Sequence, residues 1–118
     1  MSENVLRVTD YTREPFGRYI DDGDGNGEEF RTQYIVPRLK LLEGSEVLVI
    51  DLDGVEDGYG SSFVVEAFAN LIREEGYTYE YLTLNLDFRS THKEWIKEIN
   101  DYMLEANLEV SRKLLTND

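Results

Sequence analysis

The chain has 118 residues and carries 25 acidic side chains against 12 basic ones, which gives a net charge of −13 at pH 7. It contains no cysteine, and this excludes a disulfide framework, thiolate zinc sites and cysteine catalysis. So much negative charge disfavours binding to nucleic acid or to an anionic membrane surface. The length fits one domain. Because no long apolar run and no cationic leader is present, we expect a cytoplasmic protein.

The first third of the chain predicts a hairpin, an acidic turn and a helix. The expected elements are a strand over residues 5–11, a short strand over 18–20, a turn over 21–27 and a helix over 28–42. Pro37 lacks a backbone donor, so a kink or boundary is expected near Val36. Gly44 is expected to end the helix, because glycine is common after the last helical turn.

The rest of the chain predicts two strands alternating with two helices. The expected elements are a strand over residues 47–53, a helix capped by Ser61 or Ser62 and ending near Glu75, a strand over 79–86 and a helix that starts with a capping box at Thr91–Glu94. The apolar run Val47–Ile50 indicates a central, buried strand. The sequence therefore predicts a single α/β domain, a mixed sheet of about four strands with helices mainly on one side.

Asp51 and Asp53 follow this apolar run in the segment Asp-Leu-Asp-Gly-Val, which resembles the opening motif of haloacid-dehalogenase-type phosphatases. In that chemistry the first aspartate attacks a phosphoryl group and the second acts as acid and base, beside a magnesium ion. A downstream lysine and a second acidic pair after later strands are also required, and we find no such acidic pair. We predict that both aspartates are structural, with a small magnesium-dependent phosphatase as the alternative.

The acidic turn resembles part of a calcium-binding loop. Asp22, Asp24, Asn26 and Gly27 match the first, third, fifth and sixth positions of an EF-hand loop. The twelfth position, where a bidentate glutamate belongs, is Gln33. We therefore expect an acidic turn without tight calcium binding and no bound metal, with a calcium-responsive domain as the alternative.

The segment Gly58–Phe63 joins the central strand to an apolar helix. Its two glycines allow close approach of a partner to the backbone. Its two serines lie at a helix start, where backbone amides favour an anion. The simpler interpretation is a serine cap without any further role.

Several short segments together resemble the STAS-like domain family, which is related to the STAS domains of bacterial anti-sigma-factor antagonists. The similar segments are Val49–Val55, Gly60–Phe63 and Glu66–Phe68, with Gly17–Tyr19, Gly27–Arg31 and Pro37 before them. The resemblance covers roughly residues 5 to 100.

This resemblance implies a regulatory binding module without catalytic residues or cofactors. Antagonists of this kind bind a serine kinase of the histidine-kinase-like ATPase fold, which phosphorylates a serine at the helix start. Ser62 matches the acceptor, with Ser61 beside it, whereas Gly60 and Phe63 replace the aspartate and glycine of the usual motif. The residues expected to contact the partner are Gly58, Tyr59, Gly60 and Phe63.

We therefore expect a non-catalytic regulatory module whose partner is a protein with a basic face, a histidine-kinase-like ATPase or serine kinase, and not nucleic acid or a membrane. The end segments 1–4 and 110–118 are expected to be disordered or to bind a partner. The sequence leaves the oligomeric state open.

Overall fold

The computed structural model describes residues 4–116. Its elements, in chain order, are β1 (Asn4–Arg7), the 3-10 turns η1 (Val8–Asp10) and η2 (Ile20–Asp22), α1 (Gly27–Glu29), the π-helical segment η3 (Phe30–Ile35), α2 (Val36–Lys40), β2 (Leu48–Asp51), α3 (Ser61–Val64), the π-helical segment η4 (Val65–Ala69), α4 (Asn70–Arg73), α5 (Tyr79–Asn85), β3 (Leu86–Arg89) and α6 (Lys93–Thr116). The α/β class is confirmed. Within the described residues the sheet has three strands, not about four, and they are all parallel, in the order β1–β2–β3.

The predicted hairpin is wrong, because the segment 18–20 does not form a strand. One carboxylate oxygen of Asp22 accepts hydrogen bonds from the backbone N–H groups of Arg18, at 3.2 Å, and Tyr19, at 2.8 Å. The backbone therefore curls around this aspartate into the turn η2 and has no donors to offer a neighbouring strand. The only trace of pairing in this part of the described chain is an isolated parallel bridge between Gly17 and Asn26.

The first long helix runs without interruption from residue 27 to residue 40 as α1, η3 and α2. The expected boundary near Val36 appears as a change in helix type: the Val36 N–H bonds to the carbonyl of Arg31, five residues back. Pro37 follows directly at this change from π-helical to α-helical bonding, which is one of the places where a continuous helix accommodates a residue without an N–H. The helix ends at Lys40, and Gly44 lies in the following loop with a φ of 58°.

The segment 79–86, predicted to be a strand, is mostly the helix α5. Tyr79, Leu82 and Leu86 are spaced i, i+3 and i+7, which is a helical period, whereas Leu82, Leu84 and Leu86 alternate as in a strand. The Thr78 hydroxyl accepts a hydrogen bond from the Tyr81 N–H at 3.0 Å and caps the helix. This cap settles the ambiguity, and the strand β3 begins only at Leu86.

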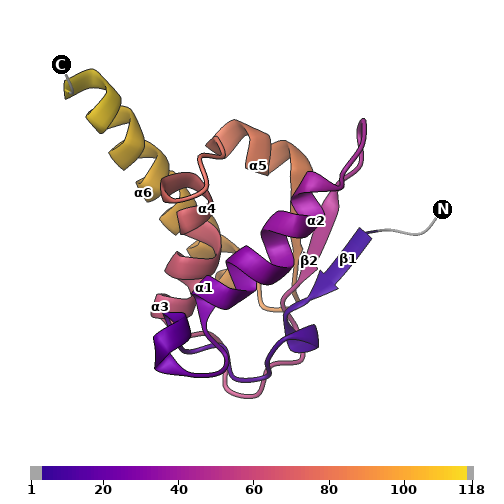
Figure 1. Ribbon diagram of the computed structural model, residues 1–118. Coiled ribbons are helices and arrows are strands. Elements are labelled where there is room, and N and C mark those ends of the chain that lie inside the picture. The colour runs from indigo at the N-terminus through magenta and orange to yellow at the C-terminus, as the bar shows by residue number, and fades with distance from the viewer. Residues whose placement is uncertain (1–3, 117–118) are drawn as a thin grey trace.

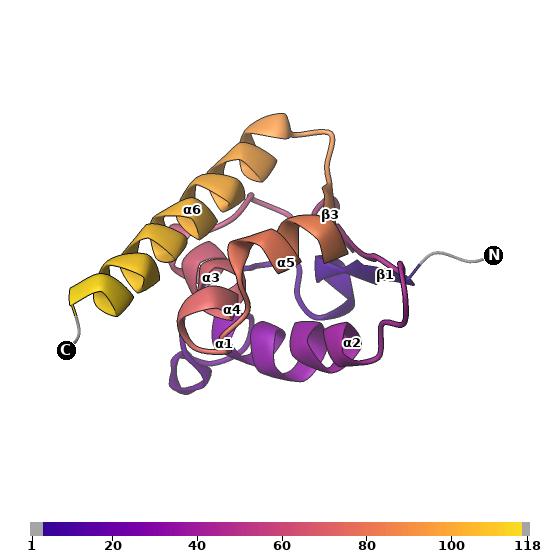
Figure 2. The same cartoon turned by 90° about the horizontal axis from the view of Figure 1, so that it is seen from above.

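The helices cover one face of the sheet (Figure 1). The buried face consists of the apolar side chains Leu6, Leu48, Ile50 and Leu86. The opposite face carries the exposed, charged side chains of Arg7, Asp87 and Arg89. Helix α6 packs on η4 and α4, and its C-terminal end extends beyond the body of the domain in both views (Figures 1 and 2).

The end segments show order within the described residues. Asn4 begins β1, and residues 110–116 are the last turns of α6. Leu114 and Leu115 on these turns are 76% and 84% exposed, so they make little contact with the domain. The expectation for residues 1–3 and 117–118 lies outside the described residues.

A buried ion pair joins the helix over residues 27–40 to the helix over residues 61–73, which is formed by α3, η4 and α4; these are the two long helices that cover the sheet. Arg31 in η3 lies 2.8 Å from the Glu66 carboxylate in η4, and both residues are 5% exposed. The Arg31 Nε also lies 3.0 Å from Glu75, which follows α4. The same guanidinium donates to the backbone carbonyl of Glu66. Its hydrogen bonds are therefore directed at one short stretch of the neighbouring helix and at that helix's end.

Arg31→Ala is expected to lower the free energy of unfolding by about 3 kcal/mol or more, because Glu66 is left buried without its counter-charge. Urea unfolding measures the loss. Lys97→Ala is the matched control, since it removes an exposed ion pair with Asp101, and exposed pairs contribute little. Equal, small effects of the two substitutions would mean that the buried pair does not hold the helices together.

Candidate functional site

The candidate site lies where the parallel strands end, at the carboxyl edge of the sheet. Two loops run beside each other there, one after η1 and one after β2. The Gly60 N–H donates to the Pro15 carbonyl at 3.0 Å, and the Glu56 N–H donates to the Arg13 carbonyl at 2.9 Å. The loop 52–60 is therefore fixed along its length to the segment 13–15. Ligand sites of open α/β sheets commonly lie at this edge.

The two serines begin α3 but do not cap it. The residue before the helix is Gly60, and no side chain caps this end, so the expected serine cap is wrong. Ser61 is exposed and Ser62 is half-buried. The Ser62 hydroxyl accepts a hydrogen bond from Nη2 of Arg18 at 3.1 Å. A cationic side chain from a distant part of the sequence thus touches the expected phosphoacceptor.

The two aromatic residues of the segment 58–63, Tyr59 and Phe63, pack toward the interior of the domain. Phe63 has no exposed surface and packs among core rings, 5.8 Å from the Phe30 ring. It offers no surface to a partner, unlike the expectation from the sequence. Tyr59 is half-buried, and its hydroxyl donates to the Leu52 carbonyl at 2.7 Å. Burial, with Asp51 and Asp53 nearby, raises the pKa of Tyr59 far above its usual value, so its hydroxyl stays protonated as a donor.

Gly60 favours the close packing of the two loops. A Cβ at this position would lie 3.2 Å from the Cα of Phe16. Gly58 has a φ of 84°, a conformation that residues with a side chain rarely adopt. The glycines thus set the shape of the loop, while the serines after them remain accessible.

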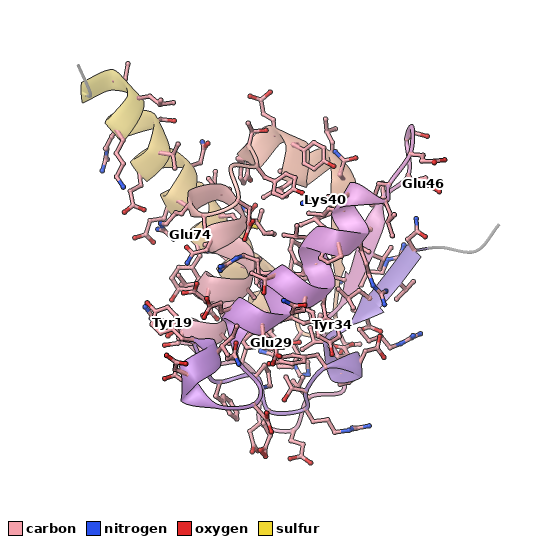
Figure 3. All side chains as sticks on the ribbon, in the orientation of Figure 1. Tyr19, Glu29, Tyr34, Lys40, Glu46 and Glu74 are labelled. Carbon is pink, nitrogen blue, oxygen red and sulfur yellow. The ribbon has the colours of Figure 1, made fainter. Side chains whose placement is uncertain are left out.

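Three exposed apolar side chains in the segment that carries Arg18 were not singled out from the sequence as contact residues. Phe16, Tyr19 and Ile20 are 44%, 49% and 49% exposed, and Tyr19 projects at the surface near the start of α1 (Figure 3). Phe16 lies against Gly60, because a Cβ on that glycine would be 3.2 Å from the Phe16 Cα, and Tyr19 and Ile20 follow Arg18 in the chain. The resemblance includes Gly17–Tyr19 but gives these side chains no role, and the contact between Arg18 and Ser62 spans 44 residues.

Asp51 and Asp53 are held by different neighbours. Asp51 lies 3.7 Å from the Arg7 guanidinium. Asp53 accepts a 2.6 Å hydrogen bond from the Ser90 hydroxyl and a 3.0 Å bond from the Thr91 N–H. These bonds hold the pKa of Asp53 below its usual range, and the bond from the Ser90 hydroxyl has the largest effect. Asp53 thereby joins the loop after β2 to the loop after β3, which accords with a structural role.

Side-chain oxygens of the acidic turn accept hydrogen bonds from backbone N–H groups. The Asn26 side chain accepts from the Glu29 N–H at 2.7 Å, as the cap of α1, and donates to the Gly23 carbonyl at 2.8 Å. One oxygen of Asp22 accepts from the backbone N–H groups of Arg18 and Tyr19, just before η2. Among residues 4–116, no group of three or more histidine or acidic side chains is placed to hold a metal ion.

The comparison with protein families matches residues 26–93 to the STAS-like domain of unknown function (DUF4325). The match covers more than half of the chain, and the protein belongs to this family. The matched residues include β2, the loop with Ser61 and Ser62, and β3. No curated protein and no solved structure matches the chain. In the part of the chain that the structure describes, no helix has the length and apolar character needed to cross a membrane.

Ser90→Ala is expected to destabilise the protein at pH 7 and to have a smaller effect in acid. The hydrogen bond lowers the pKa of Asp53 in the folded state. Its contribution is therefore present above the pKa of the unfolded chain and is lost as the pH falls through the folded value. Unfolding in urea at pH 7 and at pH 3, with Ser61→Ala as the control, measures this difference. A loss that is equal at both pH values would show that the Asp53 charge is not involved.

Proposed function

We propose that this protein is a non-catalytic regulatory module that binds a protein partner at the loop 58–63, and that phosphorylation of Ser62, or of Ser61 beside it, ends this binding. The hydrogen bond from Arg18 to the Ser62 hydroxyl carries the proposal. It places a permanent cation next to a serine at an accessible helix start. Membership of the STAS-like family supports the assignment to regulatory modules.

The surroundings of Ser62 suit a phosphate group. A phosphoserine adds a charge of about −1.5 to −2 and three strong acceptor oxygens. Arg18 can donate two parallel hydrogen bonds to such a group. The backbone N–H groups of the first helical turn add a favourable field. The modified loop would therefore keep its fold while the charge of its surface changes.

The exposed apolar side chains next to Ser62 suit the contact with a partner. Phe16, Tyr19 and Ile20 supply apolar surface, and Gly58, Tyr59 and Gly60 supply the loop. Because the chain carries a net charge of −13, a partner with a basic face is favoured. The partner that we propose is a serine kinase or a related histidine-kinase-like ATPase, as the similarity to anti-sigma-factor antagonists implies.

Ser62→Asp is expected to leave the free energy of unfolding within about 0.5 kcal/mol of the original, since an acidic residue suits the first helical turn. The same substitution is expected to weaken binding of the partner at least tenfold. A photo-crosslinking residue at Tyr19 captures the partner from cells, with one at Lys97 on α6 as the control. Equal capture by the original chain and by Ser62→Asp would contradict the proposed switch.

Phosphoserine placed at position 62 is expected to have a second pKa below its ordinary value of about 6, because the Arg18 guanidinium stabilises the dianion. A ³¹P NMR titration measures this pKa in the folded protein. Arg18→Ala should return the pKa toward 6, whereas Arg13→Ala, on the neighbouring loop, should not. The same pKa with and without Arg18 would show that Arg18 does not bind the phosphate.

A further inference from the structure

The two outer edges of the sheet differ in their hydrogen bonding. On β1 the backbone groups of Val5 and Arg7 point away from β2. The Val5 carbonyl accepts a hydrogen bond from Nη1 of Arg38 at 3.2 Å, and the Arg7 N–H donates to the Asp10 carboxylate at 3.1 Å. Side chains of the protein itself therefore occupy part of this edge, as natural proteins commonly arrange to discourage pairing with other chains.

The edge formed by β3 has no such cover at its centre. The Leu52 N–H donates to the Arg89 carbonyl at 2.9 Å, so the backbone groups of Arg89 face β2. Backbone direction alternates along a strand, and the N–H and C=O of Phe88 consequently point outward. Within residues 4–116, neither of these groups of Phe88 has a hydrogen-bond partner.

We propose that β3 pairs antiparallel with β3 of a second copy of this chain, around a two-fold axis at Phe88. In this register the two Phe88 residues exchange both of their N–H···O=C bonds, which is the hydrogen-bonded pair of an antiparallel ladder. Asp87 of each copy lies directly opposite Arg89 of the other. These are non-hydrogen-bonded pairs, in which the side chains come closest.

Charge complementarity selects a second copy as the occupant of this edge. Asp87 and Arg89 stand on the open face of the sheet, with side chains 49% and 50% exposed. They form an ion pair at 3.0 Å within the chain, and a two-fold axis between them repeats the same pairing between the chains. Opposite charges directly across two strands stabilise their pairing. On the other face of the joined sheet, the two Phe88 rings lie opposite each other.

The segments that flank β3 are held elsewhere. Ser90 and Thr91 bond to Asp53, which follows β2. Helix α6 packs mainly on the helix formed by η4 and α4, and Figure 2 shows it running from the end of β3 away from the sheet. An added strand would thus extend the sheet without displacing a hydrogen bond at Phe88. This proposal does not depend on the regulatory role proposed above.

Charge reversal of Asp87 or of Arg89 tests the proposal. The oligomeric state of the full chain is measured by sedimentation. Because each copy carries a charge of −13, the experiment uses ~0.15 M salt, which screens repulsion beyond about 8 Å. The unmodified chain is expected to dimerise reversibly. Asp87→Arg and Arg89→Asp should each weaken the dimer at least tenfold, because two attractive pairs become two repulsive ones. An equal mixture of the two variants should form the heterodimer.

Arg7→Asp is the matched control, since Arg7 lies on the same open face of the sheet but on the opposite edge. It should leave the dimer unchanged. Circular dichroism checks that every variant is folded. Hydrogen exchange of the unmodified chain adds a test that needs no substitution: the Phe88 amide should exchange more slowly as the protein concentration rises, while the Asp87 amide, which faces β2, should not change.

Two results would overturn the proposal. One is a monomer at all concentrations up to the limit of solubility, with a Phe88 amide whose exchange does not depend on concentration. The other is a dimer that both charge reversals leave intact, because that dimer would use another surface. Restoration of the dimer only on mixing the two variants would support the antiparallel register around Phe88.

Discussion

The contact between the helix over residues 27–40 and the helix over residues 61–73 determines how the rest of the domain is arranged. Gly27 lies so close to the second helix that a Cβ there would meet the Phe63 carbonyl at 2.6 Å. Four residues further on, Arg31 reaches the carboxylate of Glu66 in the same helix. A steric constraint and a buried charge pair thus fix both the separation and the register of these helices. The sheet and the loop that carries Ser62 are placed relative to that frame.

The candidate site depends on this frame through its aromatic residues. Phe63 stacks near Phe30 of the first helix, and Tyr59 meets the ring of Trp95 edge to face at 5.1 Å. The loop after β2 and the start of α3 therefore rest on rings from two distant parts of the sequence. Support of this kind holds the start of α3, and with it Ser62, in a defined position.

The central strand and the helix over residues 61–73 could be predicted, because Val47–Ile50 is an uninterrupted apolar run and residues 63–72 are apolar on nearly all sides. Residues 79–86 fit two periods, and the Thr78 cap at the start of α5 favours the helical one. The turn at residues 18–22 follows from a single carboxylate that binds backbone amides, which alternation does not reveal. The contact of Arg18 with Ser62 joins residues 44 positions apart, so no local pattern contains it.

The cover on the β1 edge limits what this protein can assemble into. A sheet that accepts new strands on both sides can grow without end, and unprotected edges of this kind lead to fibrils. Here Arg38 and Asp10 obstruct one side, so strand addition is directed to the other. When two molecules pair through the same edge, neither has a second such edge left for a further molecule. The arrangement therefore favours a closed, finite assembly even at high protein concentration.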